Sequence, residues 1–308
     1  MPLQVGTTTG LFTTPENNLE KAEKTLDCGT VNRIRDFDSY SGIFVASDEG
    51  LYHTEDGGDS WTTLDVPQQP VVSILGGPDG AKLYAGTRPA AIYISHDGGT
   101  TWKQCEGFER LPSKKDWLGF GPVDEQVRTL ATHPTTPNRI MAGVESAGVY
   151  VSDDRGSTWT ERRIGVNDDV HHLLCLNSES YVASCGRGLY RTDDVGRTWN
   201  CLDTHLEQFW HFYHREAITY EGQLYTAALD TARAKYTDEV DGQIVVSDDR
   251  GQTIGEIHPQ DSDYVLSWAI AEDHVLGGTR NGRILTSEES WGAVSGEVPG
   301  RIKSLLYI

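Results

Sequence analysis

One short pattern recurs along the chain and constrains what it can fold into more than any other feature. It reads Ser-x-Asp-x-Gly-x-Thr-Trp at residues 152–159 and 95–102. Conservative copies occupy 54–61 and 192–199; the copy at 247–254 lacks the Trp, and 287–291 is a shortened remnant. A pattern that returns at intervals of this size indicates one supersecondary unit repeated along a single domain.

Each copy follows a run rich in β-forming residues, such as 148–151, and precedes a shorter one, so each is predicted to be a hairpin turn. Asp, Ser and Thr side chains hydrogen-bond nearby backbone in turns, and Gly adopts conformations that cost other residues energy. The Trp is suited to the seam between neighbouring sheets. We therefore expect a structural and not a catalytic role for the aspartates of the pattern, which are Asp56, Asp97, Asp154, Asp194 and Asp249.

The pattern resembles the Asp-box, or BNR repeat, of sialidases and related β-propellers, and the resemblance covers nearly the whole chain. It implies an all-β propeller in which the boxes lie on turns away from the active face. The chain is also similar to the intracellular Asp-box propellers described as glycosyl-hydrolase-like, including those of haloarchaeal type. Further relatives implied by the resemblance are the photosystem II assembly factor and sortilin-type propellers, which bind protein or peptide.

The units can be counted from the strands that flank each box. Before most of the units lies a strand of the form Val-x-x-Leu or Val-x-x-Ile, as at 31–34, 127–130 and 170–173. Four short strands every 40–45 residues or so are typical of propeller blades. The first unit lacks this opening strand, and the chain ends on an extra one at 302–308. Pairing the two would close the ring, which predicts one domain over residues 1–308 with seven four-stranded antiparallel blades, six being the alternative.

The net charge of the chain indicates which classes of partner are disfavoured. The 308 residues include 46 acidic and 26 basic ones, a net charge of −20, which disfavours nucleic acid and anionic membranes. Such an acidic surface is typical of a halophilic source, where salt screens self-repulsion. An ordinary acidic cytosolic protein is the alternative.

Other bulk features predict a cytoplasmic location. The five cysteines are an odd number without a Cys-x-x-Cys pair, which favours reduced thiols over disulfides or zinc. The start at Met1 shows no signal peptide, and no apolar run is long enough to span a membrane. No nucleotide-binding or hydrolase motif occurs, so no cofactor is expected.

Arg and His gather where a propeller would place its central channel and the loops around it. Converging cations in a concave site would attract a carboxylate or a phosphate. The alternative is that they pair with neighbouring acids such as Glu145, Asp169 and Glu216 in a structural network. The candidate ligand-binding residues are Arg33, Arg88, Arg128, His171, His172, Arg187, His214, Arg215 and Arg280, with Lys303 beside them at the channel.

Metal binding and acid–base chemistry are weaker predictions. His171 and His172 should point to opposite faces of a strand, and His211-x-x-His214 is not a known ligand spacing, so no metal site is expected. Glu145, His172 and His214 are the candidates for a general acid or base.

Three functions stay open. Sialidases carry an Arg-Ile-Pro signature, three substrate-binding arginines and a Tyr–Glu pair; here Arg33-Ile34 is followed by Arg35, and only Arg33 can be matched. The favoured hypothesis is a propeller that binds a partner protein or an anionic small ligand at its loop-rich face and channel mouth. A hydrolase or lyase acting on a carbohydrate or acidic substrate is the second. The third is a scaffold without chemistry, which would expose apolar surface around Trp117 or Trp210.

Overall fold

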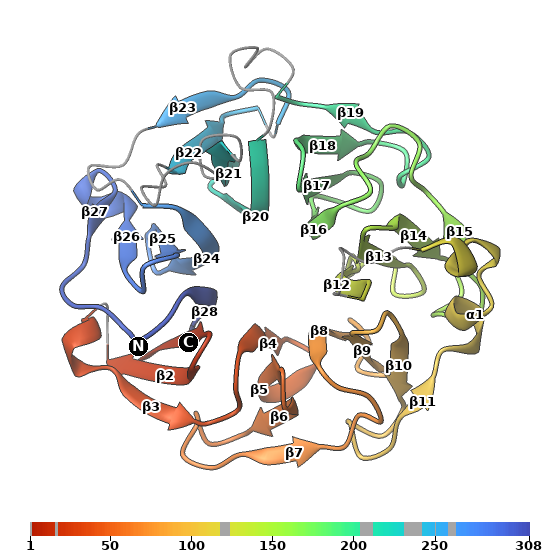
Figure 1. Cartoon of the computed structure of the whole chain (residues 1–308), viewed down its shortest axis with the longest axis horizontal. Coiled ribbons are helices and arrows are strands. Elements are labelled where there is room, and N and C mark those ends of the chain that lie inside the picture. Colours follow the sequence, from red (N-terminus) through yellow and green to blue (C-terminus); the bar gives the residue numbers. More distant parts are fainter. Residues whose placement is uncertain are drawn as a thin grey trace.

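The computed structural model is a ring of blades around a central channel (Figure 1). It describes residues 2–15, 18–117, 124–203, 212–230, 242–249, 251–257 and 263–308. In these residues the strands form seven four-stranded sheets, and all of their strand pairs are antiparallel. The prediction of a seven-bladed all-β propeller is therefore confirmed, and the six-bladed alternative is wrong. Among the described residues, no helix has the length and apolar run that a membrane crossing requires.

Each blade runs from an inner strand at the channel to a short outer strand at the rim. The inner strands, from blade one to blade seven, are β28 (Ile302–Tyr307), β4 (Val31–Phe37), β8 (Val71–Gly76), β12 (Gln126–Ala131), β16 (Val170–Cys175), β20 (Phe212–Tyr220) and β24 (Val265–Ala271). The second strands are β1 (Pro2–Thr7), β5 (Tyr40–Ser47), β9 (Leu83–Thr87), β13 (Ile140–Glu145), β17 (Tyr181–Cys185), β21 (Gln223–Asp230) and β25 (His274–Thr279).

The outer half of each blade consists of shorter strands. The third strands are β2 (Gly10–Pro15), β6 (Gly50–Thr54), β10 (Ile92–Ser95), β14 (Gly148–Ser152), β18 (Leu189–Thr192), β22 (Gly242–Ser247) and β26 (Ile284–Thr286). The outer strands are β3 (Glu23–Leu26), β7 (Thr62–Leu64), β11 (Lys103–Gln104), β15 (Thr160–Glu161), β19 (Asn200–Cys201), β23 (Gly255–Ile257) and β27 (Gly292–Ala293). Short helical segments lie between the strands at the rim: η1 (Leu19–Lys21), α1 (Glu106–Glu109), η2 (Pro112–Asp116) and η3 (Ser287–Glu289).

The last strand closes the ring. β28 pairs antiparallel with β1, with Leu3 opposite Tyr307 and Val5 opposite Leu305, so the C-terminal strand becomes the innermost strand of blade one (Figure 1). This is the closure that the unpaired strand at the end of the sequence predicted, and it removes an open sheet edge.

The hydrophobic core lies between blades. One cluster joins Leu75 and Tyr84 of blade three to Val127 and Tyr150 of blade four, and others join the remaining neighbours in the same way. Trp117 belongs to this core, since its ring lies 5.6 Å from that of Phe108 and is 8% exposed. Trp117, at which the scaffold hypothesis expected exposed apolar surface, is therefore itself buried, and Trp210 lies outside the described residues.

The repeated boxes form the turns after the third strands. In the copy after β14, Asp154 Oδ1 accepts from the Thr158 backbone N–H (2.7 Å) and the Ser152 hydroxyl (2.8 Å), and Oδ2 accepts from the Thr158 hydroxyl (2.6 Å). Asp56, Asp97, Asp194 and Asp249 make the same set of bonds. We call the face that carries these turns the turn face. The opposite end of the blades, where β13 ends at Glu145 and β16 begins at Val170, is the loop face.

Candidate functional site

A bulge near the start of each inner strand aims side chains into the channel. The register with the second strand skips one residue in most blades, for example Arg128 between Val127 and Thr129, and His171 between Val170 and His172. In β20 the skip covers both Arg215 and Glu216. In β28 it covers Lys303. Bulges leave a residue unpaired and re-aim its side chain, so this device supplies the polar lining of the channel.

Three of these residues form a group of positive charges in the loop-face half of the channel, which we call the mouth cations: Arg128, Arg215 and Lys303. Arg128 pairs with Glu145 at 2.8 Å. Arg215 donates to the carbonyl of Leu266 at 3.1 Å, and Lys303 donates to the side-chain oxygen of Asn32 at 3.1 Å. Within the described residues, neither Arg215 nor Lys303 has a carboxylate at ion-pair distance.

The mouth cations repel one another. Burial lowers the pKa of Arg215 to about 10, and the charges of Arg128 and Arg33 act in the same direction. Burial, followed by the charges of Arg215 and Arg128, holds the pKa of Lys303 well below its usual value. Positive charge is thus concentrated in half-buried side chains of a protein whose net charge is −20. An anion placed among them would relieve the repulsion.

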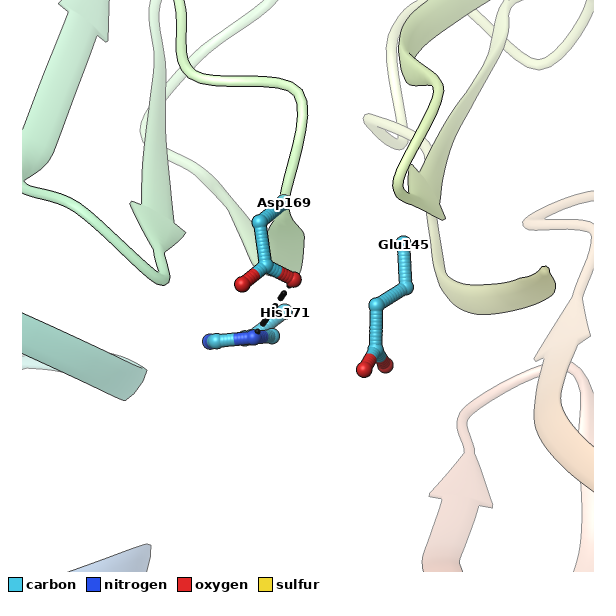
Figure 2. Close-up of side chains that lie close together, drawn as sticks. All are labelled: Glu145, Asp169 and His171. Atoms are coloured by element: carbon cyan, nitrogen blue, oxygen red, sulfur yellow. Dashed lines mark hydrogen bonds and ion pairs between the residues drawn. The ribbon is translucent and has the colours of Figure 1, made fainter. Parts of the chain in front are cut away.

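Beside the mouth cations, Glu145, Asp169 and His171 come together at the loop face from two neighbouring blades (Figure 2). Nδ1 of His171 lies 2.9 Å from the carbonyl of His214, and Nε2 lies 3.0 Å from Asp169. The ring is thus held between a backbone carbonyl and a carboxylate, both of which are hydrogen-bond acceptors.

The residue types and spacing of this group are also compatible with a metal site. One ligand atom from each residue lies within 4.8 Å of the others, and a second such group, Asp273, His274 and Glu288, lies near the surface. However, Oε2 of Glu145 already accepts from Arg128 and from Gln126 at 2.5 Å. Since Arg128 supplies a cation here, the expectation of no metal site stays a prediction.

Deeper in the channel, Glu216 of β20 lies at the centre of a second group, which we call the channel carboxylate cluster. Arg33 pairs with Oε1 of Glu216, while Arg35 and His172 lie 3.6 and 3.7 Å from the same oxygen. Burial would raise the pKa of Glu216, but the charge of Arg33, helped by Arg35, outweighs it and holds the pKa at about 2. Burial lowers the pKa of His172 to about 3, against the opposing charge of Glu216. At neutral pH, Glu216 is therefore ionised and His172 is neutral.

The other candidates lie elsewhere. His214 is fully buried and faces Asp203 at 3.3 Å and Thr226 at 3.4 Å, inside blade six and not in the channel. His214 is therefore away from the channel wall, and its role as an acid or base stays a prediction. The loop arginines Arg88, Arg187 and Arg280 make no side-chain ion pair with the part of the chain that the structure describes. The histidine His211 lies outside that part.

The structure therefore brings the sequence candidates together in two groups and adds to them. Arg128 and Arg215 join Lys303, and Arg33 and His172 meet at Glu216. The alternative of pairing with neighbouring acids accounts for Arg33, Arg128 and His171, which have acidic partners. Arg215 and Lys303 have none among the described residues, and their binding of an anion stays a prediction. Arg35 was missed as a site residue, although it lies two positions after Arg33 and strand alternation puts both on one face.

Comparison with known proteins gives one family and a set of propellers. The family model for Sortilin-Vps10, described as sortilin, neurotensin receptor 3, matches residues 90–286, well over half of the chain. A probable oligoxyloglucan-reducing end-specific xyloglucanase from Neosartorya fischeri is 28% identical over 132 residues, 39% of this chain and 15% of that protein. A xyloglucanase from Acetivibrio thermocellus is 24% identical over 184 residues, 47% of this chain and 20% of that protein.

Solved structures share the fold at low identity. The GH74 xyloglucanase from Xanthomonas campestris superposes with a TM-score of 0.62 at 16% identity, over 92% of this chain and 45% of that chain. A structure described as YCF48 bound to D1 peptide superposes with a TM-score of 0.57 at 18% identity, over 93% of this chain and 81% of that chain. The chain spans only a fifth or less of the curated xyloglucanases it matches, so the likeness establishes a glycosyl-hydrolase-like propeller fold and not their activity.

Proposed function

Because the chain belongs to the Sortilin-Vps10 family, whose description names a receptor, we propose that it is a binding propeller that takes an anionic ligand at the loop-face mouth of its channel. The ligand is either a small carboxylate or phosphate or an acidic group carried by a protein partner. The YCF48 structure, which holds a peptide on a propeller of this kind, supports the second form.

One observation carries this proposal. Arg215 and Lys303 are half-buried cations, the charges of Arg215 and Arg128 lower the pKa of Lys303, and no described carboxylate pairs with either Arg215 or Lys303. Like charges held together at a concave mouth destabilise the free protein and favour a bound anion. The guanidinium of Arg215 offers N–H groups in a plane that suits a carboxylate or phosphate, and Lys303 adds a point charge.

The test is a melting-temperature titration at low salt with inorganic phosphate, citrate and an acidic peptide. A ligand that binds only the folded state raises the melting temperature by mass action. We expect Lys303→Met to weaken binding at least tenfold, about 1.4 kcal/mol, and added salt to weaken it further. The matched control is Arg197→Met, which removes one charge from an exposed turn-face residue. No shift with any of the three probes, or an equal loss in the control, would overturn the proposal.

The probes also separate the two forms of ligand. Binding of phosphate or citrate with a dissociation constant close to that of the peptide would identify a small-anion site. Binding of the peptide alone would identify a protein partner that contacts more than the mouth cations.

A glycoside hydrolase is the second candidate. It is favoured by the likeness to xyloglucanases and by the carboxylates of Glu145 and Asp169 at the loop face, with ligand atoms within 4.8 Å of one another. Retaining glycosidases place two carboxyl groups about 5–5.5 Å apart. Release of reducing sugar from xyloglucan, lost in Glu145→Gln and Asp169→Asn, would support this function. Binding of anions without hydrolysis would favour the first.

The cytoplasmic location and the halophilic source remain predictions. Recovery of the native protein in the soluble fraction tests the first. A rise of the melting temperature with molar KCl, beyond that of a neutral protein, tests the second.

A further inference from the structure

In four blades, a small hydroxyl side chain directly after the bulge joins the inner strand to its neighbour. Ser304 accepts from Ile34 N–H at 2.9 Å, Ser73 donates to the Val127 carbonyl at 2.8 Å, and Ser267 accepts from Leu305 N–H at 3.0 Å. Thr129 accepts from Leu173 N–H of blade five in the same way. The other three blades carry larger side chains in this region: Arg33, His172, which accepts from Ala217 N–H at 3.4 Å, and Glu216, the second of the two residues skipped in β20.

These three larger side chains meet in the channel carboxylate cluster, and they leave one atom without a partner. Oε1 of Glu216 contacts Arg33, Arg35 and His172, whereas Oε2 is buried and accepts no hydrogen bond from any described residue. The Glu216 side chain is only 7% exposed. A buried unpaired polar atom costs about 1–3 kcal/mol, and more when it is charged, so such atoms usually have a partner.

The unpaired oxygen belongs to a residue that lines a cavity of about 280 Å³, far larger than one water needs. The cavity is built from the later residues of five inner strands, so it occupies the turn-face half of the channel. Its polar wall contains Glu216, Arg35 and His172. Its apolar wall contains Ile218, Trp268, Ile270 and Tyr307, and Ile270 is 41% exposed at this surface.

The charges that line the cavity indicate whether its ligand is cationic, anionic or uncharged. Oε2 of ionised Glu216 needs a donor, but the pKa of Glu216 stays low despite burial because the nearby arginines make the local potential positive. A cationic ligand would meet Arg33 and Arg35, and an anionic one would meet Glu216 and Asp36. An uncharged hydroxyl group can donate to Glu216 and accept from Arg35, which is 31% exposed, while its carbon skeleton contacts the apolar wall.

We propose that the turn-face half of the channel is a second binding site, for a small uncharged ligand that carries hydroxyl groups, such as a sugar or a polyol. Glu216 accepts a hydrogen bond from a ligand hydroxyl group, Arg35 donates one to a hydroxyl oxygen, and Trp268 and Ile270 contact the ligand's carbon atoms. The site is separate from the anion site at the loop face, and the two proposals stand or fall independently.

The experiment compares three sugars of nearly one shape by ligand-observed NMR and calorimetry: glucose, glucosamine and glucuronate. We expect glucose to bind, and the ammonium and carboxylate analogues to bind at least tenfold more weakly. Arg35→Met should weaken glucose binding about tenfold while keeping the Arg33–Glu216 pair, and so the fold. Arg197→Met, an exposed change on the same face, should leave glucose binding unchanged.

Three results would overturn the proposal. The first is no binding of any of the three sugars, which would mean that the cavity holds only water. The second is equal binding of all three sugars, and the third is glucose binding that survives Arg35→Met. Phosphate binding by the Arg35→Met variant is measured as a separate test of the loop-face site. It should be unchanged, because Arg35 is not among the mouth cations.

Discussion

Both halves of the channel contain buried or half-buried basic side chains, but the partners of these side chains differ between the two halves. In the turn-face half, Arg33 and Glu216 form a buried pair, and Arg35 also lies at ion-pair distance from the same carboxylate, so the cations there have an acidic partner. In the loop-face half, Arg215 and Lys303 hold positive charge without an acidic partner among the described residues. Once one member of a buried pair is present, the fold needs the other, whereas cations without a counter-charge reduce stability, which is the basis for proposing an anionic ligand at the loop face.

The largest expected effect follows from breaking the buried pair. Arg33→Met leaves the Glu216 carboxylate buried without its main counter-charge, and removal of one partner of such a pair typically costs about 3–5 kcal/mol. The free energy of unfolding, measured with urea, should fall by that amount. The double variant Arg33→Met/Glu216→Gln should recover most of the loss. A loss below about 1 kcal/mol would mean that Arg35 alone can hold the carboxylate.

The second prediction uses pH to examine the turn-face half. The pKa of His172 falls from 6.5 in the unfolded chain to about 3 in the fold, so below pH 6.5 only the unfolded chain takes up this proton. The stability contributed by neutral His172 is complete above pH 6.5 and is lost as pH falls toward 3. The slope is at most about 1.4 kcal/mol per pH unit.

His172→Gln should remove this slope between pH 6.5 and 5.5, where Glu216, whose pKa is 4.5 in the unfolded chain and about 2 in the fold, is still ionised in both states. The measurement is urea unfolding of both proteins at several pH values in that window. Parallel curves for the wild type and the variant would show that His172 is protonated in the folded protein, and the neutral role assigned to it would be wrong.

The contrast between the halves also shows what the sequence could predict. The number of blades and the closure of the ring could be predicted because each blade repeats one sequence pattern, so the boxes at Asp97 and Asp154 identify the fold by themselves. The ion pair between Arg33 and Glu216 could not be predicted. These residues are 183 positions apart, and only the ring brings β4 and β20 to opposite sides of one channel.

His214 shows the same limit at short range. It lies in the strand that carries Arg215 and Glu216, and simple alternation would place it near them on the channel wall. The irregular register of β20 instead turns it toward Asp203 inside the blade. A bulge that skips two residues leaves no reliable mark in a single sequence, so a prediction based on a period of two fails there.

The third prediction concerns the loop-face half and has the opposite sign from the first. Lys303→Met removes a half-buried cation that lies among other cations, so the ligand-free protein should keep its stability or gain up to about 1 kcal/mol. Urea unfolding in phosphate-free buffer measures this. A loss of more than 1 kcal/mol would show that Lys303 has a structural role through Asn32, and the comparison between the halves would fail.

The smallest effect is expected far from the channel, in the box turn after β6. Asp56 accepts from Ser60 N–H at 2.9 Å and from the hydroxyls of Thr54 and Ser60, while Asp59 in the same turn is exposed. Asp56→Ala should lower the melting temperature by about 2–4 °C, because three bonds within one turn are lost and the inter-blade core is untouched. Asp59→Ala, with the same change in charge, should leave it within 1 °C or so. Neither should alter phosphate or glucose binding, since both lie on the rim. A change of ligand affinity in Asp56→Ala alone would show that the box turns communicate with the channel, and the separation of structural turns from a binding channel would have to be given up.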